Sequence, residues 1–226
     1  TMNRSKKRVG IINHVSLEEY VYGVLAAEMP SHWPMEALKA QAVLVRTLAI
    51  YRSDRFRLHR SFGYDLCDEQ HCQVYRGAQV ENDRVRRATD ETRGQIVTYN
   101  GKPAHTVFSS NCGGHTQSGG QAGWGEVPYW TSVSDTKPVT AFPKSPLALK
   151  IFLQEEPALY CATSAHVWYP EYRWARVVSA KDIAEKIKRK KNVGRIRQIY
   201  ILKRNATGRV QKLQILGTEG SLTLNK

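Results

Sequence analysis

Hydrophobic residues recur at helical spacing near the start of the chain, and the pattern predicts a helix with one buried face. Its apolar positions are Leu17, Val21 and Val24. Ser16 and Glu19 have the spacing of a capping box, in which each side chain satisfies a free amide of the helix start. Glu28 closes the stripe, and Pro30 ends the helix because the residue before a proline is disfavoured in the α conformation.

A second helix is predicted over residues 34–52, with Pro34 suited to the first turn. Its apolar face consists of Met35, Leu38, Ala42, Val45 and Ala49. The helical period is lost over residues 55–77, which we interpret as a loop.

Turn signals organise the next part of the chain. Asn82 is placed to cap a third helix that ends near Gly94. The runs 96–99 and 104–108 flank Asn100-Gly101, a dipeptide typical of tight β-hairpins, so a hairpin is predicted there.

Residues 138–165 contain four prolines and are predicted to be irregular. A basic helix over 179–191 and strands over 196–203, 209–216 and 222–224 follow. Helices precede strands in blocks, which favours the α+β class over a doubly wound sheet. We expect a helical N-terminal part with a helix pair, then strand-rich segments that form a cleft, in one lobe or two.

The composition is strongly basic, with 34 Lys and Arg against 20 Asp and Glu and a formal net charge of +14. A field of this sign predicts a polyanionic partner. Eleven Tyr and five Trp offer faces on which sugar rings or nucleic-acid bases stack. The basic run 186–191 would also suit a nucleic-acid-binding module. Without a recognised motif of that kind, we expect no nucleic-acid partner.

No stretch is long and apolar enough to cross a membrane, since residues 42–51 are interrupted by Arg46 and fall short of about 20 residues. No signal peptide is recognisable. We interpret Thr1, which precedes Met2, as a cloning remnant and expect that an N-terminal anchor was removed.

Four cysteines permit disulfides or a metal site. The zinc-type ligands that lie within one short span are His59, Cys67, His71 and Cys72. Their spacing matches no standard zinc finger, so a Cys67–Cys72 disulfide or free thiols remain alternatives. Cys112 and Cys161 lie in separate segments and could pair in an oxidising compartment.

Several separated blocks resemble the signature of the stage II sporulation protein D family. The blocks are residues 23–30, 33–47, 73–77, 109–116 and 128–130, the last followed by Val133 and Asp135. They occur in order over about residues 10 to 225. We therefore expect residues 1–226 to form a single catalytic domain of this type.

The resemblance implies a lytic transglycosylase that cleaves peptidoglycan between N-acetylmuramic acid and N-acetylglucosamine, with Glu28 as the catalytic acid and a location outside the cytoplasm at the cell wall. It also implies strands already stripped of peptides, and hence an amidase as functional partner. Some family members carry zinc between the second helix and the block at 73–77. One branch of the family instead comprises non-catalytic enhancers of an amidase, which is the main alternative.

The residues suit that chemistry. A lytic transglycosylase needs only one carboxylate, because a hydroxyl of muramic acid itself attacks the anomeric carbon. The resemblance assigns Lys39 and Arg46 to the site, where we expect them to border a cleft and hold a substrate carboxylate. Gln41 is a weaker candidate. No cofactor is required for this reaction, and zinc, if bound by four protein ligands, would be structural.

The run at residues 109–116 is rich in glycine and short polar side chains, which allow a backbone to pass close to a ligand. The candidate sugar-binding residues in it are Ser109, Asn111, Gly113, Gly114 and Thr116. A plain tight turn after the hairpin is the alternative.

Overall fold

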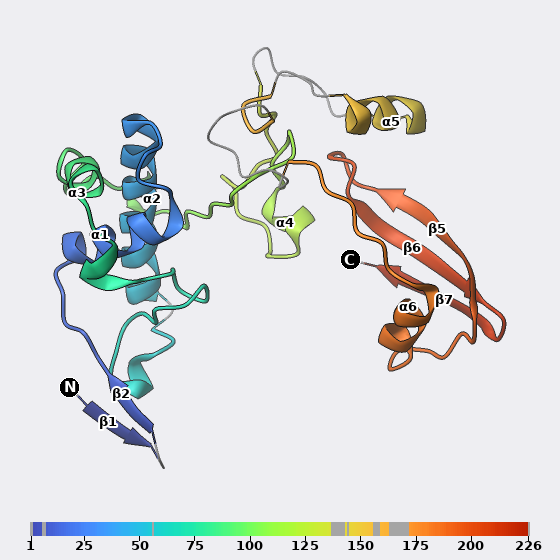
Figure 1. Ribbon diagram of the computed structural model, residues 1–226, viewed down its shortest axis with the longest axis horizontal. Coiled ribbons are helices and arrows are strands. Elements are labelled where there is room, and N and C mark those ends of the chain that lie inside the picture. The colour runs from blue at the N-terminus through green and yellow to red at the C-terminus, as the bar shows by residue number, and fades with distance from the viewer. Residues whose placement is uncertain are drawn as a thin grey trace. The chain divides into compact units, whose positions relative to one another are not determined.

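The chain folds into two compact units, Thr1–Phe108 and Ser109–Lys226. The computed structural model describes residues 2–5, 8–55, 57–136, 143, 145–155, 159–162 and 172–225. The two longest helices lie in the first unit and the longest strands in the second, so the predicted α+β class is confirmed (Figure 1). Within the described residues, no helix combines the length and apolarity that crossing a bilayer requires.

Helix α1 covers Leu17–Glu28 and begins and ends where the sequence predicts. The capping box is present, because the Ser16 hydroxyl accepts from the Glu19 N–H and the Glu19 carboxylate accepts from the Ser16 N–H. Met29 leaves the helical region, with φ −140° and ψ 133°. Glu28 is therefore the last helical residue.

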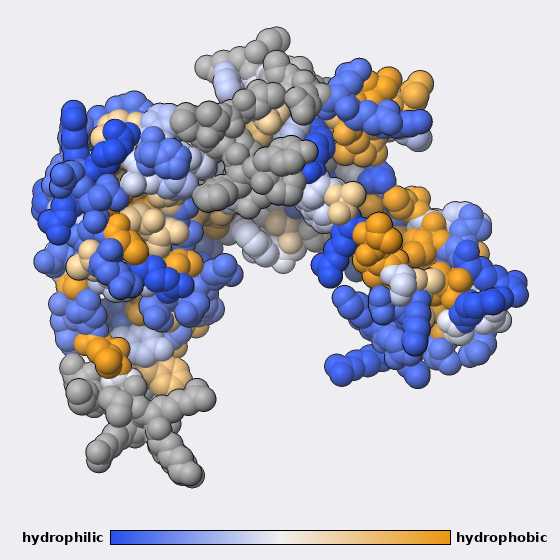
Figure 2. All heavy atoms as spheres, viewed as in Figure 1, coloured by the Kyte–Doolittle hydropathy of each residue, from blue (hydrophilic) through white to orange (hydrophobic). Residues whose placement is uncertain are grey.

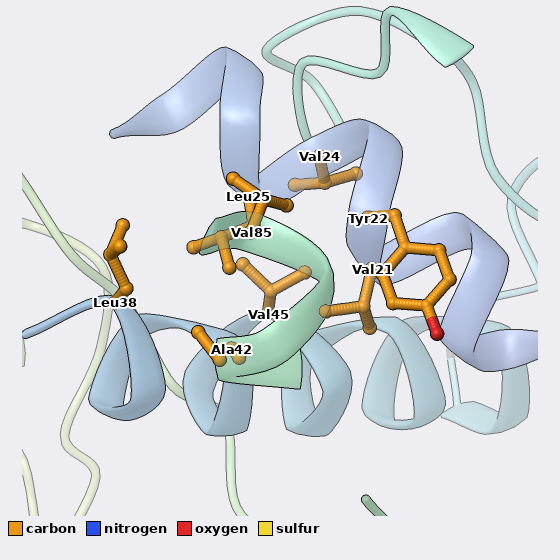
Figure 3. Close-up of a cluster of buried hydrophobic side chains, with 9 residues drawn as sticks. Val21, Tyr22, Val24, Leu25, Leu38, Ala42, Val45 and Val85 are labelled. Atoms are coloured by element: carbon orange, nitrogen blue, oxygen red, sulfur yellow. The ribbon is translucent and has the colours of Figure 1, made fainter. Parts of the chain in front are cut away.

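Helices α2 (Met35–Arg55) and α3 (Asp83–Asp90) pack with α1 (Figure 1). Asn82 caps α3 as predicted, by accepting from the Val85 N–H. Figure 3 shows the side chains of the three helices meeting in one cluster. The cluster consists of Val21, Tyr22, Val24, Leu25, Leu38, Ala42, Val45, Val85 and Ala88. Each fully buried Val or Leu in it contributes about 1.5–3 kcal/mol to folding.

Among the residues that the structure describes, Arg46 is the largest fully buried side chain, with no exposed surface. Its guanidinium pairs with the Glu18 carboxylate of α1, with Nη2–Oε2 at 2.6 Å and Nε–Oε1 at 3.0 Å. It also donates to the backbone carbonyls of Thr89 and Gln95. One residue thereby connects α1, α2, the end of α3 and the turn that follows.

Two hairpins complete the first unit. Strands β1 (Met2–Ser5) and β2 (Arg8–Ile11) pair antiparallel, which the sequence reading did not predict. Strands β3 (Thr98–Tyr99) and β4 (Lys102–Pro103) confirm the predicted hairpin, although both are shorter than expected. Its turn has φ 50° at Asn100 and 73° at Gly101, the left-handed values that this dipeptide tolerates.

The second unit contains an antiparallel sheet in the order β5-β6-β7 (Figure 1). The strands are Ile196–Arg204, Val210–Gly217 and Gly220–Asn225, in agreement with the prediction. Helix α6 covers Ala180–Ile187 and ends four residues earlier than predicted. Ile187, Val193 and Ile215 form the core between helix and sheet. Figure 2 shows hydrophobic residues gathered on the sheet, with hydrophilic ones around them.

Two further helices lie in the second unit, α4 (Gly119–Ala122) and α5 (Pro146–Gln154). The prediction of irregular structure over 138–165 is wrong for α5. Ser145 caps this helix by accepting from the Ala148 N–H, and Pro146 occupies the first turn, where its missing N–H costs nothing. The proline that suggested a break is thus part of a helix start.

We expect Arg46→Met to lower the free energy of unfolding by about 3–5 kcal/mol, because it leaves the Glu18 carboxylate without its cationic partner in a largely buried position. Urea denaturation followed by circular dichroism measures the change. Arg87→Met is the matched control, since Arg87 forms an i,i+4 ion pair with Glu91 while 69% exposed, and should cost under about 1 kcal/mol. Equal losses in the two variants would contradict the structural role of Arg46.

Candidate functional site

Glu28 lies half-buried at the C-terminal end of α1, where its carboxyl group is held from one side. The backbone N–H of Val74 donates to Glu28 Oε1 at 2.9 Å. Within the described part of the chain, Oε2 makes no hydrogen bond. The Glu28 carboxyl group is therefore oriented through Oε1, and Oε2 is the oxygen that could exchange a proton with a ligand.

The segment that supplies this N–H is fastened to the first two helices. Gln73, only 2% exposed, donates from Nε2 to the Val45 carbonyl of α2 at 3.2 Å. The Arg76 N–H donates to the Gly23 carbonyl of α1 at 3.1 Å. Val74 lies between these two attachments, so its N–H is kept at the end of α1.

The Tyr75 ring packs against α1 at Gly23, which has no side chain. A Cβ placed on Gly23 would lie 2.5 Å from Tyr75 Cε2, so only glycine permits this approach. The Tyr75 ring also stacks on Tyr20, with centroids 5.3 Å apart. Packing against Tyr75 thus explains why a glycine occupies position 23 inside a helix, which the sequence alone did not indicate.

The four predicted metal ligands, His59, Cys67, His71 and Cys72, converge. All their ligand atoms lie within 4.8 Å of one another. His59 Nε2 is 3.2 Å from His71 Nδ1. Cys72 Sγ is 3.4 Å from His59 Nε2 and 3.7 Å from His71 Nδ1. Cys67 Sγ is also 3.7 Å from His71 Nδ1.

These separations suit a tetrahedral zinc ion. Bonds of about 2.3 Å to sulfur and about 2.0–2.1 Å to nitrogen place the ligand atoms roughly 3.3–3.8 Å apart. A turn at residues 70–72 lets the adjacent His71 and Cys72 face the same point. The His71 carbonyl accepts from Arg52 of α2, and His59 stacks on Tyr64. All four cysteines are free thiols in the structure, so neither Cys67–Cys72 nor Cys112–Cys161 is joined there.

Lys39 lies in the second turn of α2 between two carboxylates. Its Nζ is 2.9 Å from Glu36 and 2.6 Å from Glu91. Hydrogen bonds, first with Lys39 and then with Arg87, lower the pKa of Glu91 to about 2. The bond to Glu91, and next that to Glu36, raise the pKa of Lys39. A substrate carboxylate would have to compete with these partners.

The structure corrects the placement of Arg46. We expected it to border a cleft and hold a substrate carboxylate, but its side chain is fully buried and engaged by Glu18. It has no surface with which to contact a substrate, so its role here is structural. Gln41 is also buried, at 7% exposure.

The predicted sugar-binding run at residues 109–116 opens the second unit. Ser109 is exposed, and the Asn111 side chain accepts from the Gly113 N–H at 2.8 Å. Gly114 has φ 106°, which favours glycine. The Thr116 hydroxyl donates to the Thr131 carbonyl at 3.2 Å. The run is therefore a hydrogen-bonded turn, and its binding of sugar stays a prediction.

Comparison with known proteins identifies the first unit. Residues 5–99, less than half of the chain, match the family model described as stage II sporulation protein, so the resemblance to that family is confirmed for this part of the chain. Residues 124–226 match a separate model described as a domain of unknown function, DUF8618. The family match is thus shorter than the span of about residues 10 to 225 that the motifs suggested. The single catalytic domain over 1–226 stays a prediction.

Three curated relatives each match about half of this chain. An uncharacterized protein of Brachyspira hyodysenteriae is 43% identical over 119 residues, which cover 53% of this chain and 32% of that protein. The amidase enhancer of Bacillus subtilis is 35% identical over 115 residues, 51% of this chain and 15% of the relative. Stage II sporulation protein D of the same organism is 35% identical over 136 residues, which cover 54% of this chain and 39% of that protein. The chain thus spans well under half the length of these relatives.

Gly23→Ala should destabilise the protein, although alanine is ordinarily about 1 kcal/mol better than glycine inside a helix. The new methyl group would meet the Tyr75 ring and push it, with Val74, away from α1. Thermal unfolding of Gly23→Ala in the wild-type and the Tyr75→Ala backgrounds tests this contact. We expect a clear loss in the first background and a much smaller one in the second. The same loss in both would show that the ring is not what excludes a side chain at Gly23.

Proposed function

We propose that this chain acts on the bacterial cell wall as the catalytic part of a lytic transglycosylase, with Glu28 as the single general acid and base. The observation that carries the proposal is the carboxyl group at the end of α1, oriented through Oε1 by the Val74 N–H at 2.9 Å. The stage II sporulation protein match over residues 5–99 supports the assignment to cell-wall remodelling. The proposed location is outside the cytoplasm, at the wall.

The proposed reaction uses Glu28 twice. It first protonates the oxygen that leaves with N-acetylglucosamine, while charge develops on the muramic acid ring. The carboxylate then accepts the proton of a muramic acid hydroxyl, which attacks the anomeric carbon and closes an anhydro ring. Water is not consumed, so a second carboxylate to activate it is unnecessary, unlike in a hydrolase.

The proposed substrate is a glycan strand stripped of its peptides, which exposes one lactyl carboxylate per disaccharide. The net charge of +14 favours such a polyanion. Lys39, 25% exposed, is the proposed contact for a carboxylate in the first unit. The run at residues 109–116 is the proposed sugar contact in the second. An amidase that removes the peptides is the proposed functional partner.

We also propose zinc at His59, Cys67, His71 and Cys72, on the fit of their separations to a tetrahedron. Four protein ligands leave no open position, so the metal would be structural. Cys72 directly precedes Gln73 and Val74, so an ordered ligand loop favours the position of the N–H that orients Glu28.

A second candidate function is the non-catalytic enhancement of an amidase. The 35% identity to a protein named amidase enhancer favours it. In that case the chain would bind glycan and leave it uncut. Mass spectrometry of denuded glycan separates the possibilities, because anhydro-muramic ends indicate a transglycosylase, reducing ends a hydrolase, and intact strands an enhancer.

Glu28→Gln should abolish formation of anhydro-muramic ends, with a loss of at least about 100-fold, because an amide cannot donate and recover a proton. Binding to denuded glycan should change little, since the shape is kept and the amide oxygen still accepts from Val74. Glu185→Gln is the control, because Glu185 is exposed on α6 and lies outside the proposed site, and it should cleave normally. Cleavage by Glu28→Gln at the wild-type rate would refute the assignment.

The purified protein should contain about one equivalent of zinc, and a chelator should lower its melting temperature, because the ligands order a loop with few apolar contacts. Elemental analysis and thermal unfolding measure the two effects. Cys72→Ser should lose the metal, whereas Cys112→Ser, outside the cluster, should retain it. A metal-free Cys112→Ser variant, in which Cys161 has no partner, would instead favour a Cys67–Cys72 disulfide if reductant destabilised it. Indifference to chelator and reductant alike would exclude both.

A further inference from the structure

A second group of thiols lies in the second unit and includes neither Glu28 nor the four zinc-type ligands. Cys112 follows Asn111 in the turn at residues 109–116, and Cys161 lies 49 positions later. Their Sγ atoms are 3.7 Å apart, and both residues are half-buried. Asp135 completes a group whose ligand atoms all lie within 4.8 Å of one another.

The backbones of both cysteines are held in place. The Cys161 N–H donates to Asp135 Oδ2 at 2.7 Å, and its carbonyl accepts from Asn111 Nδ2 at 2.9 Å. The Cys112 carbonyl accepts from Arg209 Nη2 at 3.1 Å. The two segments are therefore fixed beside each other before any covalent bond joins the sulfurs.

The surroundings of this pair differ from those of the zinc cluster. Cys67 and Cys72 share their site with two imidazoles, which complete four ligands. Cys112 and Cys161 have one carboxylate, which makes three ligands among the described residues. A structural zinc site requires four. A disulfide needs no further ligand and requires the sulfurs to close from 3.7 Å to about 2.05 Å.

We propose that Cys112 and Cys161 form a reversible disulfide by exchange with an external dithiol–disulfide couple, and that this bond fixes the turn at residues 109–116. The proposal concerns the second unit and does not depend on glycan cleavage by Glu28. If the turn binds sugar as proposed above, the bond would also hold that surface in one conformation.

The exchange proceeds in two steps. A cysteine thiolate attacks the disulfide of the oxidant, forms a mixed disulfide and releases one thiol. The second cysteine attacks the mixed disulfide, joins the two protein sulfurs and releases the other thiol. The protein gives up two electrons and two protons, and the oxidant takes up both.

The environment of Cys161 disfavours its thiolate. Burial, and next the hydrogen bond with Asp135, raise the pKa of its thiol to about 12. Its thiolate is therefore rare near neutral pH. Forming the disulfide removes the need for any thiolate beside the Asp135 carboxylate.

The test equilibrates the zinc-loaded chain with mixtures of reduced and oxidised glutathione, traps free thiols by alkylation and maps the peptides by mass spectrometry. We expect a linked peptide pair that contains Cys112 and Cys161 and disappears on reduction. Oxidation should raise the melting temperature by roughly 5–15 °C, because the cross-link restricts the unfolded chain. Cys112→Ser and Cys161→Ser should each remove the link and the redox dependence of the melting temperature.

Three results would overturn the proposal. Alkylation of both cysteines at every glutathione ratio would show that the pair does not oxidise. Links from either cysteine to Cys67 or Cys72 would show disulfide scrambling instead. Metal that persists in Cys67→Ser and is lost in Cys112→Ser would assign the second group to a metal. Glycan cleavage enters none of these measurements, so failure of the proposed enzymatic function leaves the test intact.

Discussion

The buried guanidinium of Arg46 is the interaction on which the first unit depends. It joins the Glu18 carboxylate near the start of α1 to carbonyls at the end of α3 and in the following turn. A charge with no exposed surface is tolerated only when its partners are complete, and removing one leaves the other desolvated. The pair therefore fixes α1 against α2 and α3 in one arrangement. Because Glu28 ends the same helix, its position follows from that arrangement.

The other constraint on Glu28 comes from a loop rather than a helix. Val74 lies 46 residues further along the chain, and its N–H reaches the carboxyl group because Gln73 and Arg76 are fastened to α2 and α1. A loop with few apolar residues has little burial to offset its conformational entropy. The His and Cys cluster immediately before Gln73 is where such a loop gains order. This makes the proposed zinc an indirect influence on the carboxyl group, exerted through the chain and not through a metal bond.

Features determined by neighbouring residues could be predicted from the sequence, whereas contacts between distant residues could not. The capping box of α1 and the Asn100-Gly101 turn were predicted because neighbouring residues determine them. Helix α5 was missed because four prolines indicated irregular structure over residues 138–165, whereas one of them, Pro146, occupies the first turn of the helix. The convergence of the zinc-type ligands followed from their residue types within one short span. The burial of Arg46 did not, because its partners lie 28, 43 and 49 positions away and periodicity only placed it on a helix face.

The four cysteines show how neighbours decide the chemistry of one residue type. Two thiols beside two imidazoles can be neutralised by a divalent cation that takes all four as ligands. Among the residues that the structure describes, the two thiols of the second pair have one carboxylate beside them and no fourth ligand, and this negative neighbour disfavours the thiolates that a metal would need. Cys112 and Cys161 can be uncharged either as two thiols or as a disulfide. Which of these states is populated depends on the redox couple that the protein meets. The Asp135 carboxylate, held by the Cys161 backbone, therefore favours covalent pairing over metal binding at that position.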